Sequence, residues 1–324
     1  MSNSSYFVGI DVSKPFLDVH RLPDQAQHRF ANTAAGHRSL VAWLAEQPIG
    51  LIVLEASGGY ERAAVVAMVN AGLKVFLAQP QVIRDFARSL RLRAKTDRID
   101  AAVLARYAQD RSGDVTPIDA IDPKQQALHA LVVRRDQLIE LHTMEQNRLQ
   151  QAVGGFASTK DKTSLGSLRR SLRWLEREIT RIEKAIDQTI AADPVLAARS
   201  TTLQQTPGVG PQTARVLIAA LPELGYASPK RLNNLVGVAP YAADSGDKHA
   251  PRHIAGGRKL VRNALYMAAL SASRCNPVIA GYYREMRSRG LAHKTALMAC
   301  IRRLLAYFDK LIRQLSTASA PDVG

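Results

Sequence analysis

The sequence contains little cysteine and no cysteine motif. Its two cysteines, Cys275 and Cys300, are far apart and form no CxxC pair, so neither a disulfide framework nor a zinc site is expected. We expect both in the core. The N-terminal stretch MSNSSYFVGID also lacks a basic region followed by an apolar run. No secretory signal is therefore expected, and a reducing, cytoplasmic setting is the default expectation.

Long apolar runs and nucleotide-binding motifs are also missing. No run of 18 apolar residues occurs, so we expect no transmembrane helix and no membrane partner. No GxxxxGK[ST] motif is found, so no ATP site of the P-loop type is expected.

Acidic residues are few relative to basic ones. The chain of 324 residues has 44 Lys and Arg against 28 Asp and Glu, a net charge of +16, which favours a polyanionic partner such as nucleic acid. The excess is uneven. Residues 201–324 hold 17 basic and 6 acidic side chains, whereas residues 1–118 hold 14 and 11. A basic surface concentrated in one segment is typical of a nucleic-acid face.

The first third of the chain predicts an α/β domain. Three short strands with brief gaps are followed by strands and helices in alternation, so the first strands are expected to be antiparallel and the later ones parallel. The predicted strands are 6–12, 15–22, 27–31, 50–56 and 73–78, and the predicted helices are 34–46, 60–71, 80–91 and 96–110. This order is that of an RNase H-like domain, a mixed sheet flanked by helices.

The rest of the chain predicts helices. Residues 112–123 are rich in helix breakers and indicate a linker, which is followed by helices at 124–152 and 164–191. The second helix carries a heptad seam, which predicts a coiled-coil pair that either folds back on the first helix or joins a second subunit. The seam residues are Leu165, Leu168, Leu172, Leu175, Ile179, Ile182 and Ile186. The predicted domains are 1–117, 118–198 and 199–324, and the last is mainly α-helical.

Four acids of the first domain are candidates for a metal site. Asp11 interrupts the apolar first strand and Glu55 ends the strand LIVLEA, where open α/β sheets place ligands. Asp97 and Asp100 share one face of the next helix. Four converging carboxylates would bind Mg²⁺, which prefers oxygen ligands and phosphate.

Three of these acids also have a simpler interpretation. Asp97 and Asp100 lie in the first turn of a helix, where acids cap and pair with the preceding Arg91, Arg93 and Lys95. Asp11 could be satisfied within its hairpin. If the four acids hold a metal, the three cations become phosphate contacts.

The stretch TPGVGPQTA, residues 206–214, predicts a helix-hairpin-helix. Gly208 and Gly210 permit a tight turn before a helix N-terminus, which suits a phosphate, and Thr213 completes the pattern. The alternative is an αα-hairpin without a ligand.

A loop near residue 245 combines a serine with cations. Ser245 stands between Asp244 and Gly246, and a serine in a loop is commonly a turn residue or a cap. The cations that follow could stabilise a phosphoryl transition state or hold a nucleic-acid backbone. They are Lys248, His249, Arg252, His253, Arg258, Lys259 and Arg262.

Together these motifs resemble a known family. GIDVSK, LEASG, KTDRIDA, TPGVG and the run LVGVAP…SG…GGRKLVRNALYMAA resemble the DEDD-type insertion-sequence transposases of the one-ten family and their relatives, the pilin-gene inverting recombinases. The resemblance extends from about residue 6 to residue 315.

The resemblance implies a RuvC-like N-terminal domain, a coiled coil joining dimers into tetramers, and a C-terminal transposase domain. It implies that Asp11, Glu55, Asp97 and Asp100 bind the metal and that Ser245 forms a covalent phosphoserine link to DNA. Lys248, Arg252 and Arg258 would contact phosphate. A structured bridge RNA would pair with donor and target DNA, in a prokaryotic, nucleoid-associated setting.

We therefore expect a Mg²⁺-dependent, RNA-guided DNA recombinase with a serine nucleophile. Two alternatives remain: a hydrolytic Holliday-junction resolvase-like nuclease, and a non-catalytic nucleic-acid-binding protein. Ser57, close after Glu55, is a second candidate nucleophile, although it also suits a cap before a helix.

Overall fold

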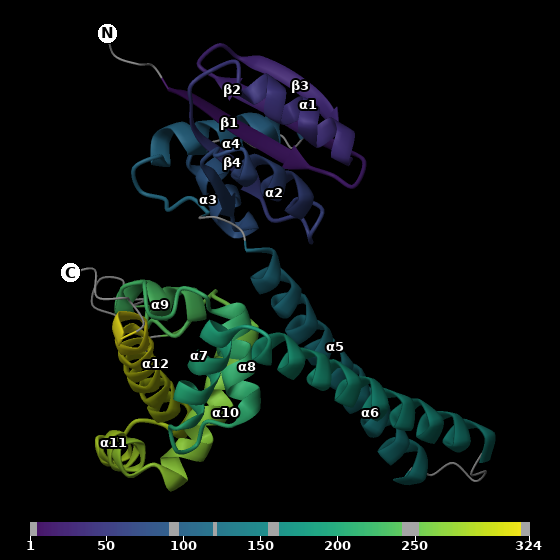
Figure 1. Cartoon of the computed structure of the whole chain (residues 1–324), viewed down its shortest axis with the longest axis vertical. Helices are drawn as coiled ribbons and strands as arrows, with labels where there is room; N and C mark the ends of the chain where they lie inside the picture. The colour runs from purple at the N-terminus through teal and green to yellow at the C-terminus, as the bar shows by residue number, and fades with distance from the viewer. Residues whose placement is uncertain (1–4, 91–96, 119–121, 155–161, 242–252, 319–324) are drawn as a thin grey trace. The chain divides into compact units, whose positions relative to one another are not determined.

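The computed structural model describes residues 5–90, 97–118, 122–154, 162–241 and 253–318, and gives the backbone alone for residues 97–99 and 318. The chain divides into two compact units, Met1–Asp122 and Pro123–Gly324, each of which is described by itself (Figure 1). The boundary falls inside the linker predicted at 112–123.

The first unit is built on a mixed sheet of five strands in the order β3-β2-β1-β4-β5. β2 is antiparallel to both β1 and β3, whereas β4 is parallel to β1 and β5 is parallel to β4. The strands are β1 (Tyr6–Val12), β2 (Phe16–Leu22), β3 (Ala26–Ala31), β4 (Ile49–Glu55) and β5 (Val75–Ala78). The predicted mixed sheet is confirmed, and it is consistent with an RNase H-like domain.

Helices cover both faces of this sheet, because the apolar residues of β1 and β4 point alternately to either side. On one face Val8, Ile10 and Ile52 pack with α1 and α2; on the other, Leu51 and Val53 pack with α3 and α4. The helices are α1 (Ala34–Leu44), α2 (Arg62–Asn70), α3 (Pro80–Ser89) and α4 (Asp97–Arg111).

Gly9 lets α4 lie directly on the sheet. A Cβ atom at Gly9 would stand 2.1 Å from the carbonyl oxygen of Ala101 and 2.2 Å from the amide nitrogen of Ala105. Only a residue without a side chain allows the helix backbone to approach the strand this closely. The first turns of α4 are thereby held over β1.

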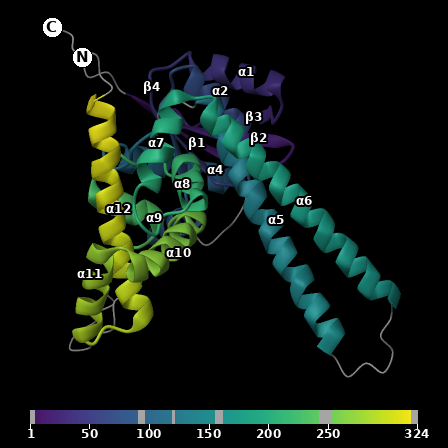
Figure 2. The ribbon, with the colours of Figure 1, turned by 60° about the horizontal axis from the view of Figure 1, so that its bottom comes forward.

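The second unit is helical throughout the part that the structure describes. Its helices are α5 (Pro123–Gly154), α6 (Lys162–Ala191), α7 (Pro194–Gln204), α8 (Pro211–Ala220), α9 (Pro229–Val236), α10 (Lys259–Cys275), α11 (Pro277–Ser288) and α12 (His293–Ala318). α5 and α6 lie side by side in both views (Figures 1 and 2). Within one chain, therefore, α6 folds back on α5, with Leu172, Leu175 and Ile186 of the seam buried.

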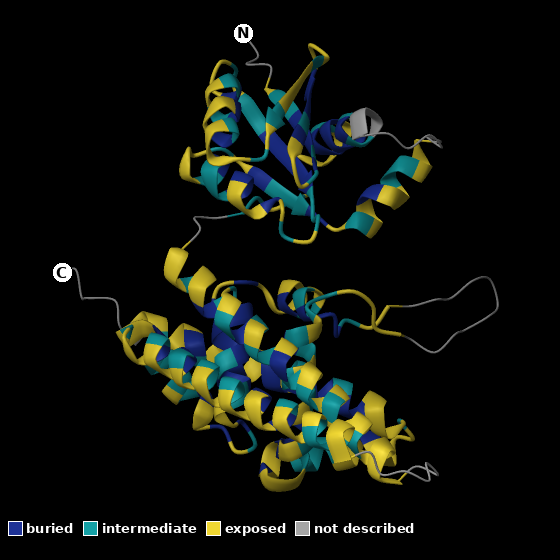
Figure 3. Cartoon of the chain, turned by 90° about the vertical axis from the view of Figure 1, so that its right-hand side faces the viewer, coloured by how far each residue is buried: buried dark blue, intermediate teal, exposed yellow. Residues whose placement is uncertain are grey.

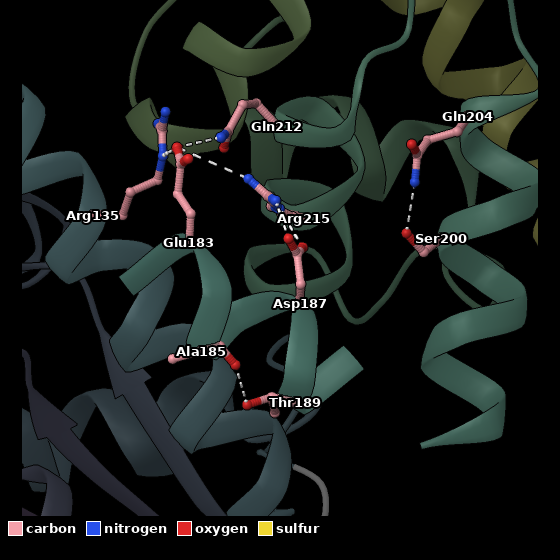
Figure 4. Close-up of polar contacts among 9 residues, drawn as sticks. All are labelled: Arg135, Glu183, Ala185, Asp187, Thr189, Ser200, Gln204, Gln212 and Arg215. Carbon is pink, nitrogen blue, oxygen red and sulfur yellow. Dashed lines mark hydrogen bonds and ion pairs between the residues drawn. The ribbon is translucent and has the colours of Figure 1, made fainter. Parts of the chain in front are cut away.

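The base of the α5–α6 pair is joined to α8. Leu128 and Val132 of α5 and Ile186 of α6 belong to the same core as Leu217 of α8. Charged side chains continue this contact (Figure 4): Glu183 accepts hydrogen bonds from Arg135 at 2.7 Å and from Gln212 at 2.6 Å. Arg215 donates to Asp187 at 2.8 Å.

The remaining helices enclose a core that includes Leu265 of α10 and Phe308 of α12, both fully buried. Figure 3 shows buried positions inside this unit and exposed positions along its outer helix faces. Cys300 is buried as predicted, whereas Cys275 is exposed at the end of α10, so that part of the prediction was wrong. None of the described helices combines the length and apolar composition needed to cross a bilayer.

Candidate active site and nucleic-acid interface

Asp11 and Glu55 lie at the carboxyl ends of two neighbouring strands. β1 and β4 are parallel, with Ile10 opposite Leu54, so Asp11 and Glu55 follow at the next position of the register. Both are half-buried. Sheets of this kind bind ligands at the carboxyl edge of their parallel strands, where these two acids are placed.

The first turn of α4 brings Asp100 toward this edge. Ala101 lies against Gly9, two residues before Asp11 in β1, and the half-buried Asp100 immediately precedes Ala101. Asp97 is the first residue of α4, but its side chain lies outside the described residues. The fold thus gathers the segments that carry the four predicted acids, and the close Gly9 contact determines where α4 begins over the sheet.

These residues fit a divalent cation by donor chemistry and placement. Carboxylates are the oxygen ligands that Mg²⁺ takes, and two of them occupy adjacent ends of parallel strands. The described side chains contain no group of three His, Cys, Asp or Glu residues already close enough to hold a metal ion.

A further acid, Asp18, lies beside this site and was missed by the sequence analysis. It is directly opposite Asp11 in the β1–β2 pairing. Arg29 of β3 holds its carboxylate with two hydrogen bonds, of 2.8 and 3.0 Å. Asp18 is thus held by a cationic partner at the same level of the sheet as Asp11.

Asn32 joins the loops that follow the two acid-bearing strands. Its Nδ2 atom donates to the carbonyl of Ser13, after β1, and to the carbonyl of Tyr60, after β4, both at 3.0 Å. Its Oδ1 atom lies 2.7 Å from Nε2 of the buried His37, so His37 must donate here. Burial lowers the pKa of His37, which favours the neutral form of this ring. Asn32 is thus a positioning residue for both loops.

A buried carboxylate organises the loop after Glu55. Glu61 accepts hydrogen bonds from the Ser57 amide at 3.1 Å, the Ser57 hydroxyl at 3.0 Å and the Gly59 amide at 2.9 Å. Burial opposes ionisation, but hydrogen bonds from its own backbone and from Ser57 and Gly59 lower the pKa of Glu61 overall. The Ser57 hydroxyl donates to Glu61 inside the loop, and the N-cap of α2 is Glu61, so the interpretation of Ser57 as the cap was wrong.

Several predicted residues lie outside the described part of the chain. They are Arg91, Arg93, Lys95, Ser245, Lys248 and Arg252. The structure does define the base of the loop that carries Ser245. Tyr241 and His253 form an antiparallel bridge, with N···O distances of 2.8 and 3.2 Å, so the described residues on either side of 242–252 are paired.

Glycines bring the chain that follows His253 against the end of α9. A Cβ atom at Gly257 would stand 2.2 Å from the amide nitrogen of Gly237, which ends α9 in the left-handed conformation. Arg262, a predicted phosphate contact, donates to the carbonyl of Gly256 at 2.6 Å and to that of Val236 at 3.2 Å. These contacts hold the loop base, a role that the basic sequence pattern could not reveal.

Arg258 also has partners within the protein. Its guanidinium donates two hydrogen bonds of 2.6 Å to Glu223 and a third of 2.9 Å to the carbonyl of Ala220. Burial opposes ionisation of Glu223, but its hydrogen bonds and ion pair with Arg258 lower the pKa of its carboxyl. Lys259, next along the chain, is exposed. Of these two predicted phosphate contacts, Lys259 is therefore the more accessible.

Replacing Arg258 by alanine is expected to destabilise the second unit by about 2 kcal/mol at pH 7, because the partly buried Glu223 loses its charged partner. The folded-state pKa of Glu223 is depressed, so this stabilisation is complete above its ordinary pKa of 4.5 and is lost as the pH falls through the folded value. Urea unfolding at pH 7 and pH 3.5 checks this. The Lys259→Ala control should change stability by less than about 0.5 kcal/mol, and equal effects of Arg258→Ala at both pH values would contradict the ion-pair explanation.

The TPGVG turn joins α7 to α8 and packs on α10. Gly208 has a φ of +93°, and a Cβ atom there would stand 2.6 Å from the Cα of Ala272. Thr213 is buried, whereas Gly210, the N-cap of α8, is exposed with open space around it. Any contact with nucleic acid at this turn would therefore involve Gly210 and its neighbouring backbone, while Gly208 and Thr213 support the turn.

Two known protein families match the same two regions of the chain. A transposase family model of the DEDD type, named for the element IS110, matches residues 8–157, which include Asp11, Glu55, Asp97 and Asp100. A second model, described as the transposase IS116/IS110/IS902 family, matches residues 200–284, which include TPGVG and Ser245.

Two of three individual relatives match nearly the whole chain. The pilin gene-inverting protein of Moraxella bovis is 26% identical over 96% of this chain and 97% of its own length. A 42 kDa protein of insertion element IS900 from Mycobacterium paratuberculosis is 24% identical over 95% of both chains. A 43.6 kDa protein of insertion element IS110 from Streptomyces coelicolor is 28% identical over 45% of this chain and 36% of its own. The chain therefore belongs to the IS110 family of insertion-sequence transposases, enzymes that act on DNA.

Proposed function

We propose that this transposase is a Mg²⁺-dependent DNA recombinase that uses Ser245 as its nucleophile and is guided by a bridge RNA paired with donor and target DNA. The observation that carries the proposal is the register of β1 and β4, which puts Asp11 and Glu55 side by side at the carboxyl edge of the sheet. The adjacent α4 turn carries Asp97 and Asp100.

The four acids would hold the metal, which when bound supplies positive charge at phosphate oxygens. The protein's part is to fix the carboxylates. Asn32 ties the loops after β1 and β4, and Glu61 orders the loop that follows Glu55. Both arrangements support the proposal, because a rigid support is what a positioned set of ligands requires.

Ser245 would perform the covalent step. Its hydroxyl oxygen bonds to a DNA phosphorus as its proton leaves, the bond from phosphorus to a deoxyribose oxygen breaks, and that oxygen takes up a proton. A hydroxyl of the other DNA strand then attacks the phosphoserine ester and releases the serine. The ester retains the energy of the phosphodiester, so no nucleoside triphosphate is consumed. The Tyr241–His253 bridge supports this role, since it closes the loop at its base.

The nucleic-acid partners follow from charge and family. Residues 201–324 hold most of the excess of basic over acidic residues. Gly210 with its neighbouring backbone, Lys259, and the residues Arg91, Arg93, Lys95, Lys248 and Arg252 are proposed contacts to DNA or RNA. Assembly of dimers into tetramers through the α5–α6 pair belongs to the same proposal.

Replacing Ser245 by alanine tests the chemistry. Recombination of donor and target DNA should vanish, together with any protein-DNA adduct that survives denaturation, whereas Ser57→Ala should retain both, because the Ser57 hydroxyl already donates to Glu61. A Ser245→Ala variant that still recombines would refute the nucleophile. Hydrolytic cutting that persists in it would favour the resolvase-like alternative.

A further inference from the structure

The outer face of α6 carries positive charge and one exposed aromatic ring. With about 100° between successive residues, the seam residues Leu172, Leu175 and Ile179 face α5, and the opposite side carries a different set. We name this set the α6 outer face: Arg170, Arg173, Trp174, Arg177, Arg181 and Lys184, all exposed. The acids of the helix, such as Glu176 and Glu178, lie to the sides of this face.

The cations of this face have few partners. Arg181 pairs with Glu178 at 2.9 Å. Among the described residues, Arg170, Arg173 and Arg177 take part in no ion pair. Arg173, Arg177 and Arg181 follow at i, i+4 spacing, where like charges destabilise a helix. This row of like charges lowers the stability of the helix, and a bound polyanionic partner would offset that loss.

Trp174 indicates which polyanion. Its side chain is 47% exposed, and Arg170 and Arg177 lie one helical turn before and after it on the same side of α6. An indole ring among arginines is typical of proteins that stack an unpaired base while holding the flanking phosphates. A second copy of the same face would bring like charges together, which argues against self-association here.

We propose that the α6 outer face binds an unpaired strand of nucleic acid, with a base stacked on Trp174 and phosphates held by the arginines. The inference rests on the proposed function only in that the enzyme works on nucleic acid. From Arg170 to Lys184 the face is about 21 Å long, which matches about six stacked nucleotides. The α5–α6 pair extends beyond the other helices of its unit (Figures 1 and 2), and the side chains of the face are exposed.

Fluorescence tests the site directly. The chain has two tryptophans, Trp43 and Trp174, so the full-length Trp43→Phe variant reports on Trp174 alone. Single-stranded 20-mers of DNA or RNA, added in EDTA, should quench this fluorescence in parallel with binding followed by anisotropy. Trp174→Ala should weaken binding about tenfold. Oligonucleotide binding that leaves the Trp174 emission unchanged would overturn the inference.

Charge neutralisation provides the matched control. Arg170→Gln, Arg173→Gln and Arg177→Gln together should lower the slope of log affinity against log salt by about 2. The same change at the exposed residues Arg284 and Arg287 of α11 and Arg289, its C-cap, should lower it much less. Equal decreases of the slope in the two triple variants would overturn the site. Quenching by a blunt duplex or by polyglutamate that equals the quenching by the single strands would also overturn it. If the parent protein itself bound no oligonucleotide, the result would instead contradict the enzyme's action on nucleic acid. None of these binding measurements requires the protein to recombine DNA.

Discussion

Replacing Asp11 by asparagine is expected to lower the rate of DNA strand cleavage about a thousandfold, the scale seen when one preorganised electrostatic group is lost. The amide has the shape of the carboxylate but no charge with which to hold a cation. Asp11 is half-buried at the end of β1, so the substitution should leave the fold intact, which a melting curve followed by circular dichroism can check.

Asp18→Asn is the matched control for this prediction. Asp18 is opposite Asp11 in the β1–β2 register, but Arg29 already holds its carboxylate. Loss of that ion pair should change the cleavage rate by no more than about fivefold. If Asp18→Asn slowed cleavage as much as Asp11→Asn, general electrostatics at this edge would explain the effect and the proposed ligand role of Asp11 would fail.

Replacing Gly9 by alanine should have a large effect on stability. The added methyl group would stand 2.1 Å from the Ala101 carbonyl oxygen and 2.2 Å from the Ala105 amide nitrogen, and both are backbone atoms of α4. The helix must move away from the sheet, which should destabilise the first unit by about 3 kcal/mol and displace the turn that carries Asp100.

Gly113→Ala is the control, since a Cβ atom there meets no atom within 4 Å. Chemical unfolding of both variants, together with their cleavage rates, tests the role of Gly9. A Gly9→Ala protein with wild-type stability and activity would show that the close contact between α4 and β1 does not position the site.

The sequence predicted the elements of the first unit well, because their signals are local. The strand at 6–12 and the helix at 34–46 appear as β1 (Tyr6–Val12) and α1 (Ala34–Leu44). Alternating apolar residues and short gaps predicted antiparallel first strands, and the pairing of β1, β2 and β3 confirms this. The edge at which Asp11 and Glu55 meet followed from the same reasoning.

The supporting residues could not be predicted, because their partners depend on register and tertiary packing. Asp18 becomes a neighbour of Asp11 only when the β1–β2 hairpin has formed. Asn32 joins carbonyls of Ser13 and Tyr60 that are distant in the sequence. The glycine of VGID offered a signal, since glycine inside a strand indicates close approach of another backbone, and Gly9 does contact α4.

The net charge predicted a nucleic-acid partner, but it did not predict which contacts each basic side chain makes. Arg258 and Arg262 belong to a basic run, yet Arg258 is held by Glu223 and Arg262 by backbone carbonyls. Membership of a transposase family removes the non-catalytic alternative. Whether the reaction is covalent or hydrolytic depends on whether Ser245 is the nucleophile.

The most direct test of the proposed chemistry is to locate the DNA-linked residue. The protein is incubated with Mg²⁺, donor and target DNA and its copurified RNA, denatured and digested, and the peptide that carries a nucleotide is identified by mass spectrometry. We predict a nucleotide on Ser245, formed only with Mg²⁺ and absent from the Asp11→Asn variant. Cleaved DNA with no linked peptide, or a nucleotide on another side chain such as Ser57, would contradict the proposal.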